Sequence, residues 1–472
     1  MALTKVTYSM IQGAALNVLD YGAVGDGIAD DTAAMNAAAT AAGAAKKSLY
    51  VPAGVYKMTA PWVVPIKVYV LGESPSVQAG YDPANAWQYG SIIYKAHTGN
   101  GVTKIGTAPY DPGAPIENIT VSSHRTNFAG GNGFVIDQCS NVHLIRCNVF
   151  SVGGDCYQLG VTAGDVTGHN YVYNCYSNNP VGVHYRVRQK WARFEYPVTD
   201  GGTIGMYLDN APEAEIDGFH FEGFSQIGIK ISNVSSNAVF TGRGYIGHTR
   251  PNAVIGVQIT NEDGNGGAVF ENVSFYANNT AGDVGVSLSQ KAISATFVNC
   301  KFNSWDTGFY TLATYGDTRT TVQNCIFSGS NLPIYAAGDN TYFLDNTFES
   351  TIGVCDINHI AGTRGMWSGN TFDNGPKATL SGVQGNYSGI RVKDNTGFVS
   401  RNYGTTTLIT AYTNIAHGLA GLPRSQIILS SNSSGVTTFP QISSIDTTNF
   451  ALFWAGTASV QWNWEAALPC DY

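Results

Sequence analysis

Charged residues are scarce in this chain, at 12% of 472 residues against about 25% in an ordinary soluble domain. There is no long basic run and the formal net charge is −8, which argues against a nucleic-acid partner. No apolar stretch approaches the roughly 20 residues that a membrane helix requires. Residues 1–17 also lack the sustained apolar core of a signal peptide. We therefore predict a protein made in the cytosol without Sec export, with no nucleic-acid partner and no membrane insertion.

The cysteines form no C-x-x-C pair and no cluster with metal-ligand spacing. Several of them recur at one position of the repeat described below, so we predict buried free thiols that pack as small hydrophobic side chains. We predict no cofactor and no metal site. Glycine (55) and tyrosine (26) are plentiful, a mixture that suits strands and turns better than helices.

The middle of the chain repeats a short pattern of an apolar residue, any residue, and then Asn, Asp, Gly or Cys. An apolar or aromatic residue follows three positions later, as in Ile216-Asp-Gly218 with Phe221. The third position falls at residues 118, 147, 174, 218, 242, 272, 299, 324, 345 and 369. The intervals are 21–30 residues, except for one of 44. We interpret that interval as two periods of 22, with a degenerate turn near residue 196.

A period of 20–30 residues without helical segments between the repeats indicates a solenoid of strands. Such an extended core also accounts for a chain that is too long for one compact core. The apolar residues of each turn point inward, and the third position marks a sharp bend where a left-handed backbone is tolerated. The cysteines at or beside this bend are Cys147, Cys175, Cys300 and Cys325. We predict an all-β fold, a parallel β-helix solenoid.

The two ends of the chain differ from the repeat. An Ala-rich run ends at Lys46-Lys47, and Asp30 or Asp31 is placed to accept hydrogen bonds from the first free amides of a helix. We expect this helix to cap the first edge of the solenoid. Beyond residue 385, short strands at 426–429, 450–454 and 460–464 predict a small C-terminal β-sandwich. The predicted segments are a lead-in (1–16), an N-terminal cap with the first turns (17–110), the central β-helix (111–385) and the C-terminal domain (386–472).

The run Asn17–Thr32, followed by Leu49–Tyr56, resembles the opening of the pectate-lyase-like β-helix superfamily. The preceding Lys5–Ala14 is similar to the segment before the β-helix in tailspikes of tailed bacteriophages. The terminal His417–Pro423 and Trp462–Glu465 are similar to small β domains found on such proteins. The resemblance implies a right-handed parallel β-helix. It also implies a homotrimer on the virion tail. Such a trimer binds, and usually degrades, a bacterial capsule or O-antigen polysaccharide at the cell surface.

The same opening motif occurs in polygalacturonases, lyases, epimerases and glucanases, so it specifies a fold and leaves the activity open. No large anchoring domain precedes residue 17 in this sequence. We therefore expect attachment to a phage tail or baseplate protein through a very short segment or through another protein.

Hydrolysis of a glycosidic bond requires two carboxyl groups, one protonated and one ionised. Outward-facing residues two apart on a strand, or equivalent ones on adjacent turns, lie at suitable distances. The richest acidic segment is Glu213–Glu222, and the preceding turn, His184–Tyr196, combines cations, aromatic residues and Glu195. We predict catalytic carboxylates at Glu195, Glu215, Asp217 and Glu222. The predicted substrate-binding residues are Arg186, Arg188, Lys190, Trp191, Arg193, Tyr196 and His220.

Three functions remain open at this point. The first is hydrolysis of a polysaccharide. The second is a lyase or epimerase in which a base, with Tyr185 or Tyr196 as candidates, removes the proton α to a uronate carboxylate; the arginines would hold the uronate. The third is a binding spike without catalysis, in which aromatic side chains stack on sugars. For each of these residues the alternative to a functional role is a purely structural one. The charges would then form a solvated surface on which the carboxylates balance the arginines.

Overall fold

The computed structural model describes the following residues: 13–76, 89–108, 110–161, 168–232, 235–248, 251–260, 267–288, 294–312, 319–337, 340–349, 357–361, 365–372, 390–396, 401–408, 412–416, 427–431, 440–445, 449–453 and 460–467. Most of the lead-in, Lys5–Gln12 included, and the segment His417–Pro423 lie outside these residues. The chain divides into two compact units, Met1–Asn278 and Asn279–Tyr472. We call them the first and second unit and describe each by itself.

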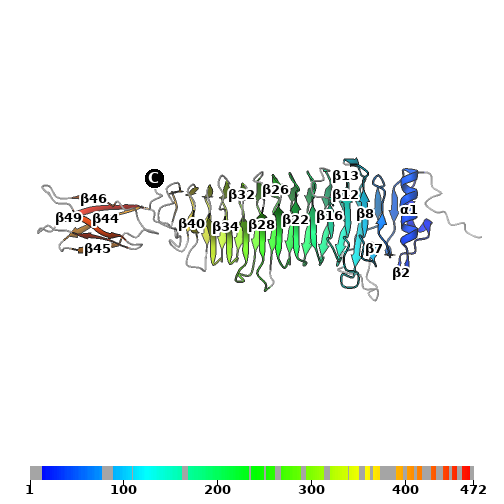
Figure 1. The fold of residues 1–472 in the computed structure, drawn as a ribbon, viewed down its shortest axis with the longest axis horizontal. Coiled ribbons are helices and arrows are strands. Elements are labelled where there is room, and N and C mark those ends of the chain that lie inside the picture. The colour runs from blue at the N-terminus through cyan, green and yellow to red at the C-terminus, as the bar shows by residue number, and fades with distance from the viewer. Residues whose placement is uncertain are drawn as a thin grey trace, which may run out of the picture. The chain divides into compact units, whose positions relative to one another are not determined.

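The first unit is built from three parallel sheets, named A, B and C here, which the chain visits in turn (Figure 1). Its strands of sheet A are β1 (Leu16–Asn17), β3 (Leu49–Val51), β6 (Val70–Gly72), β10 (Ile116–Glu117), β14 (His143–Ile145), β17 (Tyr171–Tyr173), β20 (Arg193–Glu195), β23 (Glu215–Asp217), β26 (Ala238–Thr241) and β29 (Ala268–Glu271). Those of sheet B are β2 (Asp26–Asp30), β4 (Gly54–Met58), β7 (Ser91–Lys95), β11 (Ile119–Ser123), β15 (Asn148–Phe150), β18 (Tyr176–Asn178), β21 (Val198–Asp200), β24 (His220–Glu222), β27 (Tyr245–Gly247) and β30 (Ser274–Tyr276).

The first unit's strands of sheet C are β5 (Trp62–Val63), β8 (Val102–Ile105), β12 (Phe134–Asp137), β16 (Tyr157–Leu159), β19 (Val183–Val187), β22 (Ile204–Asp209), β25 (Ile227–Ser232) and β28 (Ile255–Thr260). A short pair, β9 (Asp111–Pro112) and β13 (Cys139–Ser140), adds a two-stranded sheet. Each turn of chain therefore contributes one strand to each of the three sheets. The predicted right-handed parallel β-helix is confirmed.

The bend from sheet A to sheet B holds the predicted left-handed residues. Positive φ values occur at residues 118, 174, 218, 242, 272, 299, 324, 345 and 369, as the repeat predicts. Tyr196 takes the same conformation with a φ of 52°, which accounts for the degenerate turn. The prediction is wrong by one residue at one turn, where Arg146 rather than Cys147 has the positive φ. There Leu144 is buried and Ile145 is partly exposed, so the buried residue of the pattern was misassigned.

The core is a stack of equivalent side chains from successive turns. Tyr157 and Tyr185 stack with ring centroids 4.7 Å apart, and Phe240 and Phe270 stack at 4.5 Å. The predicted buried thiols are confirmed for the described cysteines, which are buried and not joined in disulfides: Cys139, Cys147, Cys156, Cys175, Cys300 and Cys325. Cys355 and Cys470 lie outside the described residues.

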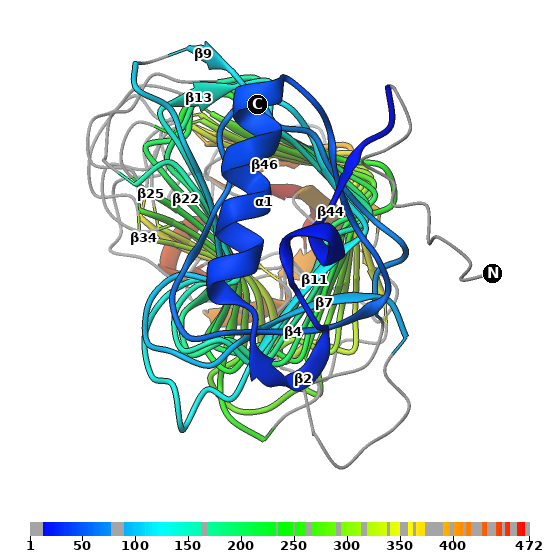
Figure 2. The same ribbon diagram turned by 90° about the vertical axis from the view of Figure 1, so that its right-hand side faces the viewer.

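Helix α1 (Thr32–Ala45) lies across the first end of the solenoid (Figure 2). It buries Met35, Ala38, Ala39 and Ala42 and follows a 3-10 turn, η2 (Val18–Tyr21). Asp30 accepts a hydrogen bond from the Thr32 amide at 3.0 Å, as one of the two predicted caps. The carboxylate of Asp31 instead accepts from the amides of Val24 and Gly25 and so fixes the approach to the helix. In the described part of the chain, no helix is long and apolar enough to cross a membrane.

The second unit continues the same repeat and then changes. Its parallel strands are β31 (Val284–Leu288), β32 (Ala295–Val298), β33 (Lys301–Asn303), β34 (Thr307–Leu312), β35 (Thr320–Gln323), β36 (Ile326–Ser328), β37 (Leu332–Ala337), β38 (Thr341–Leu344), β39 (Thr347–Glu349), β40 (Ile357–Ala361), β41 (Gly365–Ser368), β42 (Thr371–Phe372) and β43 (Ile390–Lys393). Because β43 pairs in parallel with β41, the parallel part extends beyond the predicted boundary at residue 385.

Two antiparallel sheets follow in the second unit. One contains β44 (Arg401–Leu408), β49 (Val460–Ala467) and β46 (Ile428–Ser431), and the other contains β45 (Tyr412–Ala416), β48 (Asn449–Phe453) and β47 (Gln441–Ile445). The ring of Phe450 packs edge-on against Trp464 of the other sheet, with centroids 5.3 Å apart. Leu452 and Trp462 are fully buried. The predicted C-terminal β-sandwich is confirmed.

A buried histidine makes the stability of the first unit depend on pH. His184 is fully buried, and its Nε2 donates to the carbonyl of Gly201 while its Nδ1 accepts from the Ser177 hydroxyl, at 2.8 Å each. Burial lowers its pKa to about 4. Between pH 6.5 and 4 the unfolded chain therefore binds the proton more readily than the folded chain. We expect about 3 kcal/mol of stability to be lost over this range as the pH falls.

The test compares thermal unfolding at pH 7.5 and pH 4.5, followed by circular dichroism, for the wild type and His184→Gln. The variant should show a smaller drop in melting temperature between the two pH values, because glutamine does not titrate. Equal drops for both proteins would contradict the prediction.

Candidate functional site

Two outward-facing rows of polar and aromatic side chains cross sheet A in the first unit. Strand pairing puts His143, Tyr171, Arg193, Glu215 and Val239 in one row. The second row contains Ile145, Tyr173, Glu195, Asp217 and Thr241. Paired positions on neighbouring strands are about 4.8 Å apart. Three of the predicted catalytic carboxylates, Glu195, Glu215 and Asp217, therefore lie on one face of one sheet.

Arg193 lies between two of these carboxylates. Its Nη2 is 2.8 Å from Oε1 of Glu195, and its Nε is 4.0 Å from Oε2 of Glu215. The hydroxyl of Tyr171 donates to Oε2 of Glu195 at 2.7 Å. Burial and then this hydrogen bond raise the pKa of Tyr171, so the hydroxyl keeps its proton. Both contacts hold the Glu195 carboxylate in a fixed position.

A pocket of about 470 Å³ opens over these strands. Its described lining residues are His143, His169, Tyr171, Trp191, Arg193, Glu195, Glu213 and Glu215. A smaller pocket of about 180 Å³ is lined by Arg193, Phe194, Glu215, Ile216, Asp217, Val239 and Thr241. Because the two pockets share Arg193 and Glu215, they adjoin and form a groove that crosses β20 and β23. We call these two pockets together the sheet A groove.

The turn that enters sheet A carries a second row of left-handed residues. Equivalent positions, each two residues before the first row, are Asn141 (φ 57°), His169 (φ 62°), Trp191 (φ 53°), Glu213 (φ 59°) and Asn237 (φ 55°). Asparagine tolerates this conformation, whereas other side chains pay a steric cost of roughly 1–2 kcal/mol. The costly residues are the three in the middle, and all three line the larger pocket. Backbone strain of this kind concentrates at functional sites.

The exposed aromatic surface of the groove comes from the same turn. Trp191 is 39% exposed and stacks on His169, with ring centroids 4.8 Å apart and planes 16° from parallel. The ammonium of Lys190 lies 5.6 Å from the Trp191 ring. His143 packs edge-on against Tyr171, and burial lowers the pKa of His143. An apolar ring beside carboxylates is an arrangement suited to a sugar face.

Two of the predicted site residues lie on the neighbouring sheet. The bend at Gly218 turns the chain from β23 to β24, so His220 and Glu222 face outward from sheet B. His220 Nε2 is 3.1 Å from Glu222, and its ring stacks on Tyr245 at 4.5 Å. Asp200, which the sequence analysis missed, is paired with Glu222 on the adjacent strand. These residues do not line either pocket of the sheet A groove.

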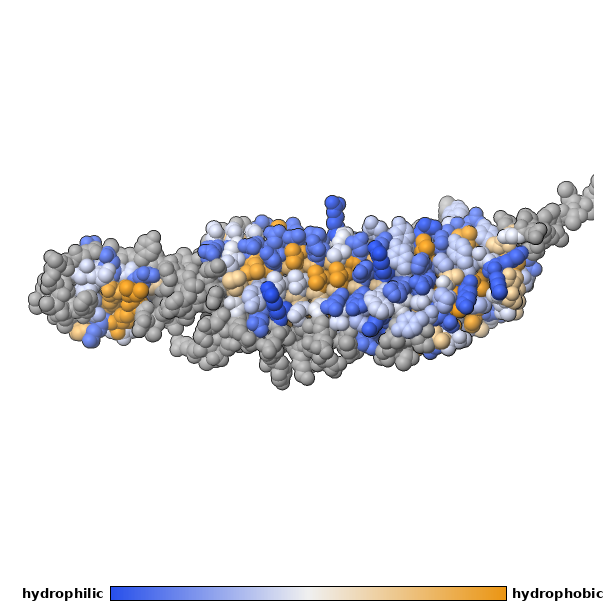
Figure 3. Space-filling view, turned by 90° about the horizontal axis from the view of Figure 1, so that it is seen from above, coloured by the Kyte–Doolittle hydropathy of each residue, from blue (hydrophilic) through white to orange (hydrophobic). Residues whose placement is uncertain are grey.

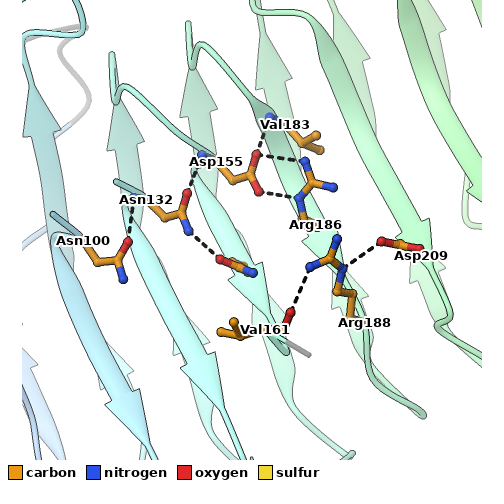
Figure 4. A network of polar contacts seen from close by, with 9 residues as sticks. Asn100, Asn132, Asp155, Val161, Val183, Arg186, Arg188 and Asp209 are labelled. Carbon is orange, nitrogen blue, oxygen red and sulfur yellow. Dashed lines mark hydrogen bonds and ion pairs between the residues drawn. The ribbon is translucent and has the colours of Figure 1, made fainter. Parts of the chain in front are cut away.

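Two of the predicted substrate-binding arginines lie on the sheet C side of the solenoid, where each forms an ion pair with an aspartate (Figure 4). Arg186 on β19 forms an ion pair with Asp155 and lies over the Tyr207 ring at 5.1 Å. Arg188, just after β19, is 2.8 Å from Asp209. The partners are 31 and 21 residues away in sequence. The sequence grouped these arginines with Arg193, but the turn between β19 and β20 separates them onto different sheets.

The two tyrosines proposed as a lyase base differ in location. Tyr185 is fully buried in the core, and its hydroxyl donates to the Cys175 carbonyl at 2.7 Å, so its assignment as a base is wrong. Tyr196 is 50% exposed at the bend after β20 and packs edge-on against Tyr173. It does not line either pocket of the groove.

The sequence analysis missed four residues of the larger pocket as site residues: His143, His169, Tyr171 and Glu213. The repeat carried a usable signal, because Tyr171, Arg193 and Glu215 are separated by one period of 22 residues. Among the described residues, no group of three or more His, Cys, Asp or Glu side chains is arranged to hold a metal ion.

The sequence places the chain in a known family. A model of the family described as rhamnogalacturonase A/epimerase, pectate lyase-like, matches residues 15–335. Because this match covers well over half of the chain, the protein belongs to that family, and the pectate-lyase-like resemblance of its opening residues is confirmed. No curated protein matches the chain in sequence.

Solved structures with a similar fold include phage tailspikes. The tailspike gp61 of Pseudomonas phage phi297 is 13% identical, with a TM-score of 0.43, and the match covers 96% of this chain and 99% of that one. A mutant tailspike of E. coli bacteriophage HK620, solved in complex with a pentasaccharide, is 11% identical with a TM-score of 0.44 and coverages of 96% and 93%. The A-module of mannuronan C-5 epimerase AlgE4 from Azotobacter vinelandii is 16% identical, with a TM-score of 0.41 and coverages of 80% and 94%. These likenesses concern the fold alone.

If the left-handed residues of the groove are kept for function, replacing them with asparagine should stabilise the protein. We expect Glu213→Asn to raise the free energy of unfolding by about 1 kcal/mol and the melting temperature by about 2 °C. The reciprocal control is Asn237→Glu, at the equivalent position outside the groove, which should lower the melting temperature by a similar amount. A lower melting temperature for Glu213→Asn would contradict the strain argument.

Proposed function

We propose that this protein is a phage tailspike that binds a bacterial surface polysaccharide, a capsule or an O-antigen, and depolymerises it by glycosidic hydrolysis. One observation carries the proposal. At the turn that enters sheet A, the left-handed residues other than asparagine are His169, Trp191 and Glu213, and all three line the pocket beside Glu195 and Glu215. Backbone strain concentrates at functional sites, so its recurrence at three consecutive turns supports a function for this pocket. Membership of a family described by a rhamnogalacturonase and an epimerase supports a polysaccharide as the ligand.

In the proposed mechanism Glu195 is the general base, because Arg193 and Tyr171 hold its carboxylate in place. Glu215 is the general acid, since it is exposed to both pockets and is diagonal to Glu195 across the strand pair. Positions two residues apart on adjacent parallel strands are roughly 8 Å apart. This spacing of the backbone positions is compatible with the roughly 6.5–9.5 Å between the carboxyl groups of an inverting hydrolase. Asp217, paired directly with Glu195, is the alternative partner.

Hydrolysis by this route adds one water molecule to each bond that breaks. Glu195 removes a proton from the water, whose oxygen bonds to the anomeric carbon. Glu215 gives its proton to the glycosidic oxygen as the bond between carbon and oxygen breaks. The stacked rings of Trp191 and His169 hold a sugar of the chain beside these carboxylates.

As a tailspike the chain would act as a homotrimer, joined to a tail or baseplate protein, at the bacterial surface. A row of outward aliphatic side chains on sheet C supports burial against another copy. Ile204, Ile227 and Ile255 are paired along neighbouring strands, and each is only partly buried in the single chain. Apolar groups also lie between polar ones on the face shown in Figure 3. Closed symmetry buries such a face in every subunit.

The catalytic proposal is tested with purified protein and a panel of bacterial capsules and O-antigens, with product masses determined by mass spectrometry. We expect oligosaccharides of repeat-unit mass plus one water. Glu195→Gln and Glu215→Gln should each lower the rate by about 10²–10⁴-fold, because a general acid or base is lost.

The matched control is Glu271→Gln. Glu271 is exposed at the end of β29 on the same sheet and does not line either pocket, so this variant should keep the wild-type rate. Products lighter by one water would instead identify a lyase. Tight binding without any product, unchanged in the Glu→Gln variants, would identify a binding spike.

The trimer is tested by light scattering coupled to size-exclusion chromatography. We expect a mass of about three times the chain mass of 50.2 kDa. Ile227→Lys should shift the protein toward monomer, because a charge in the aliphatic row opposes its burial. A wild-type mass of one chain would contradict the proposal.

A further inference from the structure

We infer that the sheet A groove accepts a sugar unit without a carboxylate, a neutral or amino sugar, and rejects uronates. The inference rests on the proposed function of the groove and names its substrate class. It replaces the expectation that an arginine-rich surface holds uronate groups. Four observations about charge and contact carry it.

The first observation is the charge of the lining. Among the described residues of the larger pocket, Glu195, Glu213 and Glu215 are carboxylates, and Arg193 is the cation. The adjoining pocket adds Asp217 to Arg193 and Glu215. Carboxylates therefore outnumber the cation along the whole groove. A bound carboxylate about 6 Å from one of these groups is disfavoured by about threefold, even with the full dielectric of water.

The second observation is the position of the cation. Arg193 bridges Glu195 at 2.8 Å and Glu215 at 4.0 Å. A uronate that bound Arg193 would compete with both carboxylates and would lie among them. A neutral hydroxyl or an amide can accept from the guanidinium without displacing either pair. An ammonium group can instead pair with the exposed Glu213 or Glu215.

The third observation is where the neighbouring cations lie. Arg186 is paired with Asp155 and Arg188 with Asp209, both on sheet C. The ammonium of Lys190 lies over the ring of Trp191. Of the cations in this segment, Arg193 lines the groove and Lys190 lies beside it, whereas Arg186 and Arg188 lie elsewhere. The segment therefore delivers fewer cations to the groove than its sequence suggests.

The fourth observation concerns the reaction. A lyase or epimerase removes the proton α to a uronate carboxylate, so its site must neutralise that carboxylate as negative charge develops. In the sheet A groove the guanidinium already pairs with Glu195 and Glu215. Hydrolysis needs no such neutralisation, since its charge develops as an oxocarbenium ion, which carboxylates stabilise. Substrate charge and reaction type thus point to the same chemistry.

The experiment uses the polysaccharide panel, sorted into polymers with and without uronates. Each acidic polymer is also tested after carbodiimide activation and borohydride reduction, which convert uronates to neutral hexoses and leave the linkages in place. We expect cleavage of polymers that carry no uronate at the cleaved unit, with cleavage of an acidic polymer only after reduction. Cleavage of an intact polymer next to a uronate, lost on reduction, would overturn the inference and leave the proposed depolymerase function intact. Absence of cleavage and binding for every polymer would overturn the proposed function itself.

A charge variant tests the physical cause on whichever polymer is cleaved. Glu213→Gln keeps the left-handed turn and removes one negative charge without altering Glu195, Glu215 or Arg193. With fragments of that polymer carrying a free amine, an N-acetyl group or a uronate as probes, Glu213→Gln should raise the affinity of the uronate form relative to the neutral N-acetyl form by about threefold at 20 mM salt, and relative to the amine form by about tenfold. The change should vanish at 1 M salt, where the Debye length is about 3 Å. An unchanged ratio at 20 mM salt would contradict the charge argument, whereas a merely structural effect of the variant would not depend on salt.

Discussion

Every outward position on this protein depends on the in-register stacking of successive turns. Strand pairing repeats the same alignment from one turn to the next, as in the row His143, Tyr171, Arg193 and Glu215. Each side chain therefore has its nearest neighbours about 4.8 Å above and below, on other turns. A left-handed residue at each bend keeps the turns in phase. The core tolerates little change under this constraint, but the outward rows are free to carry a site.

Stacking also limits which charges a row can hold. Like charges on neighbouring turns repel at such a distance, and an opposite charge beside them reduces this repulsion. In the sheet A groove Arg193 has this role for Glu195 and Glu215. On sheet C, Asp155 and Asp209 have it for Arg186 and Arg188. The same electrostatic rule produces a carboxylate site on one sheet and a neutralised ladder on the next.

The sequence predicted the core better than the site. Positions 118 to 369 of the repeat were recognisable because one apolar side chain and one left-handed residue recur in every turn. The assignment slipped at Ile145, where two adjacent apolar residues fit the pattern equally well. The grouping of carboxylates succeeded for Glu215 and Asp217, which share a strand, and failed for Glu222, which follows the bend at Gly218. The partners of Arg186 and Arg188 were not predictable, because they are set by pairing between turns.

At the turn before sheet A, the left-handed residues other than asparagine coincide with the proposed site. Asn141 and Asn237 show what the turn before sheet A prefers when nothing else is required. His169, Trp191 and Glu213 occupy the same turn at greater cost, and Tyr196 does so at the next bend, where asparagine or glycine is usual. Each of these side chains is larger than asparagine and reaches beyond the surface of the sheet. The solenoid has thus exchanged some stability at consecutive turns for side chains that an extended ligand can contact.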